Sequence, residues 1–360
     1  MKDNALQSVL ERVYAADVPD RDDIAYLLQL QGEDELRRLF GSADKVRAEY
    51  CGDGILLRGL VEFSSYCRNT CFYCGLNRQN VNVERYRLSI EEIMDAVDRI
   101  AAKGIRTVVL QSGEDDELDA AWLADLVQRI KQRFDMAVTL AVGERPAQEY
   151  KLWRQAGADR YLLKIETTDA ALYRRLHPHM SFENRLACLE TLRDLGYQVG
   201  SGSLVGLKGQ TVQSLVEDVL FFKRANFDMI GIGLFIPHEA TPLAAEPMGD
   251  LELTLKVLAV TRIVTRSAHL PATTAVGSVS GDARLRALQA GANVLMPNFT
   301  PAAYRSLYEI YPYKRCVKED PAAAVDGVAA AVRTIGRTID YARGDSLKTA
   351  CAGVLHNPTI

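Results

Sequence analysis

From about residue 55 onward, apolar strand-like runs alternate with amphipathic helical segments. This alternation is typical of α/β proteins, in which helices connect parallel strands. One helix is well marked, because Ser89 and Glu92 form a capping box and an apolar stripe continues almost to Gly104. Eight strand–helix units predict a complete (β/α)8 barrel of the TIM type, with an open doubly wound sheet as the alternative. The predicted strands cover residues 56–64, 107–111, 137–142, 160–166, 198–205, 229–235, 270–275 and 293–296.

Two regions flank this alternation. Residues 1–50 contain short amphipathic stretches that predict an N-terminal helical cap, and the barrel is assigned to residues 51–315. Residues 316–360 are assigned to a C-terminal extension. Within it the Ala- and Val-rich stretch 321–341 is predicted to be helical. After Arg343 the pattern is lost, which predicts a loosely attached end.

The overall charge and the apolar runs limit where the protein works. The 360 residues carry a net charge of −4, which argues against a general role on nucleic acid or on a membrane surface. No apolar run is long enough to span a bilayer, and the first residues lack a signal-peptide core. We therefore expect a cytoplasmic protein that binds neither nucleic acid nor membrane. Seven cysteines in such a protein indicate thiols and metal ligands, not a disulfide framework.

Three of these cysteines lie on one short loop directly after the first predicted barrel strand. Cys67, Cys71 and Cys74 are spaced by four and three residues, and Tyr73 precedes the last of them. Three thiolates can hold three irons of a 4Fe-4S cluster and leave the fourth iron open to a chelating ligand. A structural zinc site would need a fourth ligand, usually from a second close pair, and no such pair is present. A single, oxygen-sensitive 4Fe-4S cluster is therefore the favoured interpretation.

Polar residues and glycines gather where the predicted strands end. The carboxyl ends of barrel strands carry the active site, so these residues together favour a pocket, although each alone could be an ordinary turn or cap. Glu166 can accept hydrogen bonds from ribose hydroxyls or an ammonium group. Arg185 can pair with a carboxylate, although a lone arginine is more simply a solvated charge on a helix. The strand-end residues include Gln111, Ser112, Gly113, Glu114, Thr139, Gly143, Glu144, Arg145, Glu166, Gly202, Thr273 and Thr274.

Three further residues have less specific interpretations. His177 and His179 are closely spaced, but no carboxylate or cysteine accompanies them at ligand spacing, so a loop role is favoured over metal binding. Cys188 falls on the apolar stripe of a predicted helix and is interpreted as a core residue.

The loop from Cys67 to Cys74 resembles the signature of the radical S-adenosylmethionine (SAM) superfamily. This resemblance implies that the amino and carboxylate groups of SAM chelate the open iron. It also implies that one electron, from an external donor, cleaves SAM to methionine and a 5′-deoxyadenosyl radical.

Longer motifs, spread from about residue 55 to 315, resemble the HydE-type maturases of iron-only (FeFe) hydrogenases. They are residues 62–69, 109–115, 143–145, 158–163, 165–167, 176–178, 181–185, 228–233 and 271–275. The resemblance implies a complete barrel with the cluster and SAM near its top, and Cys67, Cys71 and Cys74 as the cluster ligands. The SAM contacts that we carry over with it are Tyr73, Ser112, Gly113, Glu114, Glu166 and Arg185. The implied substrate contacts are Gln111, Thr139, Ala141, Met229, Thr273 and Thr274.

The same resemblance implies a function in building the two-iron part of the hydrogenase H-cluster. The substrate would be a cysteine-bound iron carbonyl cyanide unit, made by a tyrosine-lyase radical SAM maturase, and the deoxyadenosyl radical would attack its sulfur. The product would pass to a GTPase scaffold maturase. The implied cofactors are one 4Fe-4S cluster and SAM.

The chain departs from the family pattern in three places, and other functions compete with this one. Lys208 stands where a proline is usual, which is expected to affect a loop and not the chemistry. Some members hold a second cluster with three C-terminal cysteines, but here no cysteine follows Cys316 until Cys351, which predicts no second cluster. Ala141 stands where a small hydroxyl residue is common. The competing interpretations are a radical SAM amino-acid mutase that makes methylornithine and a non-catalytic iron–sulfur scaffold. A biotin synthase type of enzyme would need cysteines for a second cluster within the barrel.

Overall fold

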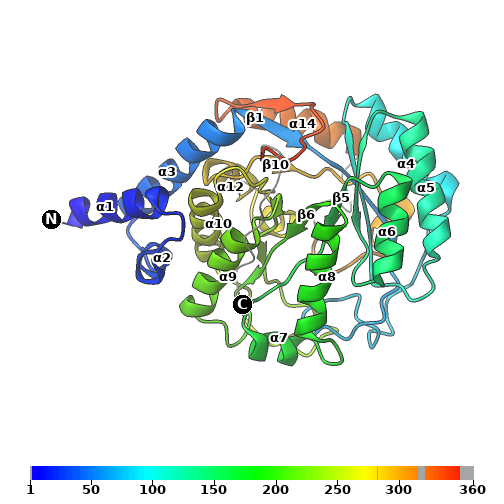
Figure 1. The fold of residues 1–360 in the computed structure, drawn as a ribbon, viewed down its shortest axis with the longest axis horizontal. Helices are drawn as coiled ribbons and strands as arrows, with labels where there is room; N and C mark the ends of the chain where they lie inside the picture. Colours follow the sequence, from blue (N-terminus) through cyan, green and yellow to red (C-terminus); the bar gives the residue numbers. More distant parts are fainter. Residues whose placement is uncertain (1, 282, 315–320, 349–360) are drawn as a thin grey trace.

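The computed structural model describes residues 2–281, 283–314 and 321–348. The N-terminal cap is helical, as predicted, and extends from one end of the molecule (Figure 1). Its helix α3 packs along α10, and buried Ile24, Leu27 and Leu39 join the cap to the main hydrophobic core. The cap helices are α1 (Lys2–Ala15), α2 (Arg21–Leu28) and α3 (Glu33–Cys51).

A parallel sheet of six strands forms the centre of the molecule, in the order β2-β3-β4-β5-β6-β8. Its strands are β2 (Gly59–Ser64), β3 (Thr107–Ser112), β4 (Ala137–Ala141), β5 (Arg160–Leu162), β6 (Gln198–Ser201) and β8 (Met229–Ile230). Helices connect the strands, as the alternation predicts, and the predicted Ser89–Glu92 capping box starts the first of them. They are α4 (Ile90–Ala102), α5 (Ala120–Arg133), α6 (Ala147–Ala156), α7 (Ala170–Leu176), α8 (Phe182–Asp194), α9 (Val212–Ala225), α10 (Leu251–Thr265), α11 (Thr274–Val279), α12 (Ala283–Gln289) and α13 (Ala302–Arg305).

Further pairings extend this parallel arrangement. Strand β1 (Gly54–Leu57) lies between β10 (Val294–Leu295) and β11 (Thr338–Asp340), and β7 (Leu204–Val205) pairs with β9 (Gly233–Leu234). Single parallel bridges then carry the order from β8 round to β2. They join Met229 to His269, Pro271 to Val294, and Asn298 to Leu60.

Six predicted strands are shorter or more broken than expected. The stretch 56–64 divides into β1 and β2, and the stretches 160–166 and 293–296 shorten to Arg160–Leu162 and Val294–Leu295. The stretches 198–205 and 229–235 each divide in two, because the backbones of Gly202 and Gly231 approach closely: a Cβ added at Gly202 would lie 2.1 Å from the Gly231 carbonyl oxygen. The stretch 270–275 has only isolated pairings, since Pro271 has no N–H to donate and helix α11 begins at Thr274.

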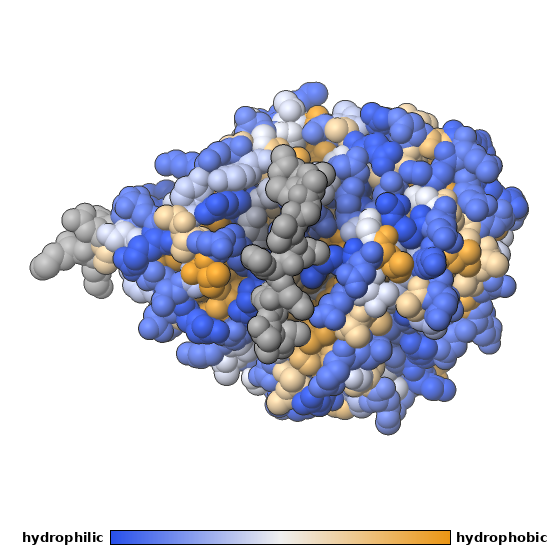
Figure 2. All heavy atoms as spheres, viewed as in Figure 1, coloured by the Kyte–Doolittle hydropathy of each residue, from blue (hydrophilic) through white to orange (hydrophobic). Residues whose placement is uncertain are grey.

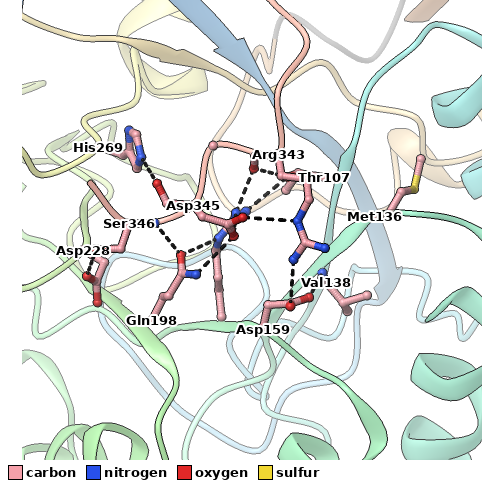
Figure 3. A network of polar contacts seen from close by, with 12 residues as sticks. Thr107, Met136, Val138, Asp159, Gln198, Asp228, His269, Arg343, Asp345 and Ser346 are labelled. Carbon is pink, nitrogen blue, oxygen red and sulfur yellow. Dashed lines mark hydrogen bonds and ion pairs between the residues drawn. The ribbon is translucent and has the colours of Figure 1, made fainter. Parts of the chain in front are cut away.

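The prediction for the C-terminal extension needs correction. Helix α14 (Pro321–Arg333) is present, but residues Thr338–Asp340 form strand β11 and do not continue the helix to residue 341. Nor is the stretch 344–348 loosely attached. Residues 343–346 run across the amino-terminal ends of the barrel strands and join a polar network there (Figure 3). We call this stretch the floor segment.

Side chains alternate between the two faces of the central sheet. On β4, Val138 and Leu140 belong to the core that the helices cover, whereas Thr139 and Ala141 point to the opposite, inner face. The outer surface seen in Figure 2 is mostly polar, with apolar side chains in small separate patches. Within the described part of the chain, no helix is long and apolar enough to cross a membrane.

Candidate active site

The three-cysteine loop lies at the carboxyl end of β2, where the predicted site should be. Its thiols are partly buried, and burial raises the pKa of Cys71 well above its ordinary value and that of Cys74 to about 12. The neighbouring thiols raise both further, so the sulfurs lie close enough together to feel one another's charge. Backbone N–H groups of Asn69 and Glu114 favour the thiolate of Cys67. Crowded thiols with N–H donors around them suit a cluster that takes all three as thiolates.

The loop after β3 braces the cysteine loop. Glu114 accepts hydrogen bonds from Arg68 Nη2 at 2.8 Å and Asn69 Nδ2 at 2.6 Å, and its backbone oxygen accepts from the Arg68 N–H at 2.9 Å. Gly113 lies directly against Tyr66 and Cys67: an added Cβ would sit 2.1 Å from the Tyr66 carbonyl oxygen. The predicted residues Gly113 and Glu114 therefore contact the loop itself, and the Ser112 hydroxyl donates to the Gly113 carbonyl at 2.6 Å.

Glu166 has a backbone conformation that is rare for a residue with a side chain. Its φ is +63°, in the left-handed region, and backbone hydrogen bonds to Gly202 and Leu204 hold it there. Its carboxylate lies 2.8 Å from Nζ of Lys164 and also raises the pKa of Cys74, which places it near the cysteine loop. Residues held in such strained backbone conformations are often found at functional sites.

Arg185 is not the solvated surface charge that a lone helix arginine suggests. Only 7% of it is exposed, its Nε donates to Glu144 Oε1 at 2.5 Å, and Nη1 donates to the Lys164 carbonyl. Its positive charge lowers the pKa of Cys71, a smaller effect than the burial that raises it, so the guanidinium is close to the cysteine loop. Arg185 and Glu166 thus converge on the loop from α8 and from the end of β5.

Tyr73 and Phe72 turn away from the main core. Both pack against a second apolar cluster formed by Leu172, Leu176, Leu207, Phe235 and Leu243. The Tyr73 hydroxyl lies 2.8 Å from Nε2 of His177, so this histidine has a loop role, as predicted, but one directed at the cysteine loop. Within the described ranges, no three His, Cys, Asp or Glu side chains are arranged to hold a single metal ion, whereas the thiolates of a 4Fe-4S cluster each bind a different iron.

Most residues predicted to contact substrate share the inner face of the sheet. The register puts Gln111 beside Ala141, and Thr139 one step nearer the floor on the same face as Ala141. The hydroxyl of Thr139 is buried and has no hydrogen-bond partner, while Gln111 Nε2 donates to the Tyr308 hydroxyl at 3.2 Å. Met229, on β8, accepts a hydrogen bond at Sδ from Arg58 at 2.5 Å. An unpartnered buried hydroxyl on this face suits a polar ligand.

Thr273 and Thr274 lie at the start of α11. Thr273 is the N-cap residue and donates its hydroxyl to the Ile232 carbonyl at 3.2 Å, and Thr274 is the first helical residue. Both remain partly exposed, unlike the next residues of this helix. Their position near the end of β9 is compatible with the prediction that both residues line the substrate cavity.

Several charged residues of the inner face were not singled out from the sequence. Glu62 is 1% exposed, makes an ion pair with Lys314 and accepts from Asn298 Nδ2 at 2.8 Å. Arg58 is also buried, and its Nε has no partner in the structure. A charged residue inside an apolar strand-like run is the signal that could have revealed both. Lys164, the partner of Glu166, carried no comparable signal. Glu144, the partner of Arg185, was among the predicted strand-end residues, but its pairing with Arg185 was not predicted.

Four cysteines lie outside the loop, and two of them, Cys51 and Cys188, are among the described residues. Cys188 is a core residue, as predicted, with 7% of its surface exposed, and Cys51 is partly buried. Cys316 and Cys351, on which the prediction of no second cluster depends, lie outside the described residues.

The comparisons with known proteins agree with this geometry. Residues 61–222 match the model of the Radical SAM superfamily, so the parallel sheet and its cysteine loop define a radical SAM enzyme, a class that uses a 4Fe-4S cluster and SAM. The chain is 50% identical over 299 residues to the FeFe hydrogenase maturase subunit HydE of Thermotoga maritima, covering 83% of this chain and 86% of that protein. It belongs to the HydE family of hydrogenase maturases.

Methylornithine synthases resemble this chain at lower identity. The chain is 31% identical to 3-methylornithine synthase of Methanosarcina acetivorans, over 76% of this chain and 78% of that protein. A crystal structure of methylornithine synthase superposes with a TM-score of 0.83 at 28% identity, covering 92% of this chain and 97% of that one. The radical SAM, TIM-barrel-like fold is therefore established, which confirms the coarser part of the fold prediction.

Proposed function

We propose that Cys67, Cys71 and Cys74 hold the 4Fe-4S cluster. The support is their grouping at the carboxyl end of β2, their mutual effect on pKa, and the N–H donors around Cys67. When bound, the cluster would pass one electron from an external donor to SAM, whose cleavage would supply methionine and a 5′-deoxyadenosyl radical. Around them Gly113 lets two loops approach each other and Glu114 fixes the cysteine loop.

We propose further that Glu166 and Arg185 are the main protein contacts of SAM. Both are charged, converge on the cysteine loop from separate elements, and are held by backbone or buried partners. A carboxylate can accept from ribose hydroxyls or the ammonium, and a guanidinium can hold the SAM carboxylate. Tyr73 and Ser112, on the loops that flank the same space, complete the proposed site.

The inner face below this site is proposed to bind the substrate, with Gln111, Thr139, Ala141, Met229 and the pair Thr273 and Thr274 as its wall. The unpartnered Thr139 hydroxyl supports a polar ligand. We also propose that the barrel is closed, since single parallel bridges continue the strand order from β8 to β2.

In function, the chain acts in assembly of the diiron subcluster of the FeFe-hydrogenase H-cluster. The radical is proposed to attack the sulfur of a cysteine-bound iron carbonyl cyanide precursor. A bond would form between this sulfur and the 5′ carbon, and the odd electron would stay on the iron complex, which would be reduced by one electron. The observation that carries this proposal is the 50% identity to HydE over most of both chains, against 31% to methylornithine synthase. The work would take place in the cytoplasm, with an external electron donor, a tyrosine-lyase radical SAM maturase that supplies the substrate and a GTPase scaffold that receives the product.

The test compares SAM cleavage by the anaerobically reconstituted, reduced protein under three conditions: no addition, the cysteine-bound iron carbonyl cyanide complex, and lysine. We expect the iron complex to stimulate formation of the adenosyl product and lysine to leave it at the unstimulated rate. Stimulation by lysine instead would assign the chain to the amino-acid mutases. Absence of cleavage despite a full iron content would favour the scaffold.

A further inference from the structure

The cysteine loop is attached to the C-terminal end of α7. Three hydrogen bonds make this attachment: Thr70 Oγ1 donates to the Pro178 carbonyl at 3.2 Å, and the Phe72 N–H donates to the Leu176 carbonyl at 3.0 Å. The third joins Tyr73 to His177 at 2.8 Å. The loop has no helix or strand of its own between residues 67 and 74, so its path depends on such contacts. Glu114 holds its first half, and the contacts with α7 hold the part from Thr70 to Tyr73.

The hydrogen bonds of His177 define which nitrogen carries the proton. Its Nδ1 lies 2.8 Å from the Tyr173 carbonyl oxygen, which can only accept, so Nδ1 is the donor. Burial lowers the pKa of His177 to about 4, and the nearby Arg185 lowers it further, so the ring is neutral. Its Nε2 then presents a lone pair to the Tyr73 hydroxyl, which donates.

Packing holds the same pair in place. The Tyr73 and His177 rings meet edge to face with centroids 5.4 Å apart, and Tyr173 lies against the other side of the histidine at 4.2 Å. Only 1% of His177 is exposed, so the imidazole has no freedom to rotate toward water. Rotating Tyr73 would leave buried Nε2 without a donor, which is costly.

Helix α7 links this contact to the other side of the proposed SAM site. The helix begins after Asp169, three residues beyond Glu166, and ends at Leu176, beside His177. Asp169 caps it by accepting from the Leu172 N–H at 2.9 Å. A single turn-and-helix unit therefore runs from the strained Glu166 to the residue that holds Tyr73.

We propose that His177 is a positioning residue for the cofactor site. By accepting the Tyr73 hydrogen bond it fixes the backbone between Cys71 and Cys74, and with it the face of the cluster that SAM must reach. This inference rests on the proposed cluster ligands, and it deepens their assignment by naming what sets their geometry. It does not depend on the identity of the substrate.

The test uses His177→Phe, His177→Gln and Tyr73→Phe, singly and with Tyr73→Phe/His177→Phe as the double variant. Glutamine keeps an oxygen that can accept near the position of Nε2, whereas phenylalanine keeps only the ring. Each variant is reconstituted and assayed for iron content, for the change that SAM causes in the electron paramagnetic resonance spectrum of the reduced cluster, and for KM and kcat of SAM cleavage.

We expect iron content to stay at the wild-type level in all variants. In His177→Phe and Tyr73→Phe the SAM-dependent spectral change should weaken and KM for SAM rise roughly three- to tenfold, the effect of one hydrogen bond. His177→Gln should restore most of the change, and the double variant should be no worse than either single one. Wild-type spectra and KM in His177→Phe would overturn the proposal, and so would additive losses in the double variant.

Two controls keep this result separate from other failures. The thermal unfolding of each cluster-free variant shows whether that variant is folded. If His177→Phe does not fold, Tyr73→Phe tests the same hydrogen bond, because it deletes only one oxygen. Lack of stimulation by the iron complex would contradict the proposed substrate and leave the His177 result standing. A full iron content in a Cys71→Ala variant would contradict the cluster ligands themselves.

Discussion

Asp345 Oδ1 lies 2.7 Å from Nη2 of Arg160, so a residue near the C-terminus neutralises a guanidinium that is completely buried at the floor of the barrel. Gln198 Nε2 donates to the same oxygen at 3.1 Å, and the Asp345 carbonyl accepts from His269 Nε2 at 2.9 Å (Figure 3). The Ser346 hydroxyl continues the network to Asp228 at 2.5 Å. The floor segment therefore ties together the first residues of strands that are far apart in sequence.

Removing this carboxylate should destabilise the protein. We expect Asp345→Ala to lower the free energy of unfolding by about 1–3 kcal/mol, because buried Arg160 loses its counter-charge. The loss is not larger because the side chain of Asp345 is half-exposed, and water weakens its interaction with Arg160. The matched control is Asp326→Ala, whose carboxylate is 73% exposed and pairs with Lys103 on the surface. That variant should change stability by less than about 0.5 kcal/mol. If both variants lost the same free energy of unfolding in denaturant, the contact of the floor segment with Arg160 would contribute no more to stability than a surface ion pair.

A buried carboxylate on α9 predicts a pH dependence of stability. Burial raises the pKa of Asp218 to about 7, although its Oδ1 accepts from the Thr168 N–H at 2.7 Å and from the Thr168 hydroxyl at 2.6 Å. Its other oxygen, Oδ2, has no partner, which fits a proton on that atom. The folded state then binds more protons than the unfolded state from about pH 4 to pH 7.

Wild-type stability should therefore fall as the pH rises through this window, with a contribution from Asp218 of a few kcal/mol, and then level off. Asp218→Asn keeps an oxygen for Thr168 and removes the titration, so the stability of the variant relative to the wild type should rise from about pH 4 to pH 7 and then stay constant. Unfolding free energies of both proteins across this range provide the measurement. A difference that stays constant with pH would contradict the account.

Much of the fold was predictable because its signals are local. Capping boxes and apolar stripes mark helices such as α4 without reference to the rest of the chain. The floor segment was not predictable, since Arg343, Asp345 and Ser346 look like surface residues until the barrel brings Arg160 and Asp228 to them. The strand breaks at Gly202 and Gly231 depend on a close contact between two strands, which is equally non-local.

The proposed site divides in the same way. The spacing of Cys67, Cys71 and Cys74 is visible in the sequence because one loop carries all three. The burial of Arg185 against Glu144 and the contact of His177 with Tyr73 join residues that are 41 and 104 positions apart, so no local pattern marks them.

The lack of space for a side chain at Gly113 gives a further prediction. Gly113→Ala would place a Cβ 2.1 Å from the Tyr66 carbonyl oxygen and 2.9 Å from Cys67 Cβ, so the cysteine loop must shift. We expect reduced iron content after reconstitution. Gly41→Ala is the control, because nothing lies within 4 Å of the added Cβ and the residue sits inside helix α3. It should keep full iron content and gain about 0.5–1 kcal/mol of stability.

Replacing single cysteines tests the cluster ligands. Cys71→Ala should lose most of the iron and the visible absorption of the cluster, because only two loop thiolates remain. Cys51→Ala, at a partly buried cysteine outside the loop, should keep both. Iron loss in Cys51→Ala, or its retention in Cys71→Ala, would require another set of ligands.

The central claim is tested most directly by identifying the adenosyl product by mass spectrometry after one turnover. The reduced protein is supplied with SAM and the cysteine-bound iron carbonyl cyanide complex. Our account predicts that the 5′-deoxyadenosyl group is recovered attached to the sulfur of that complex. Recovery of free 5′-deoxyadenosine alone, in the same amount with and without the iron complex, would contradict the proposed attack on sulfur and leave a radical SAM enzyme with another substrate.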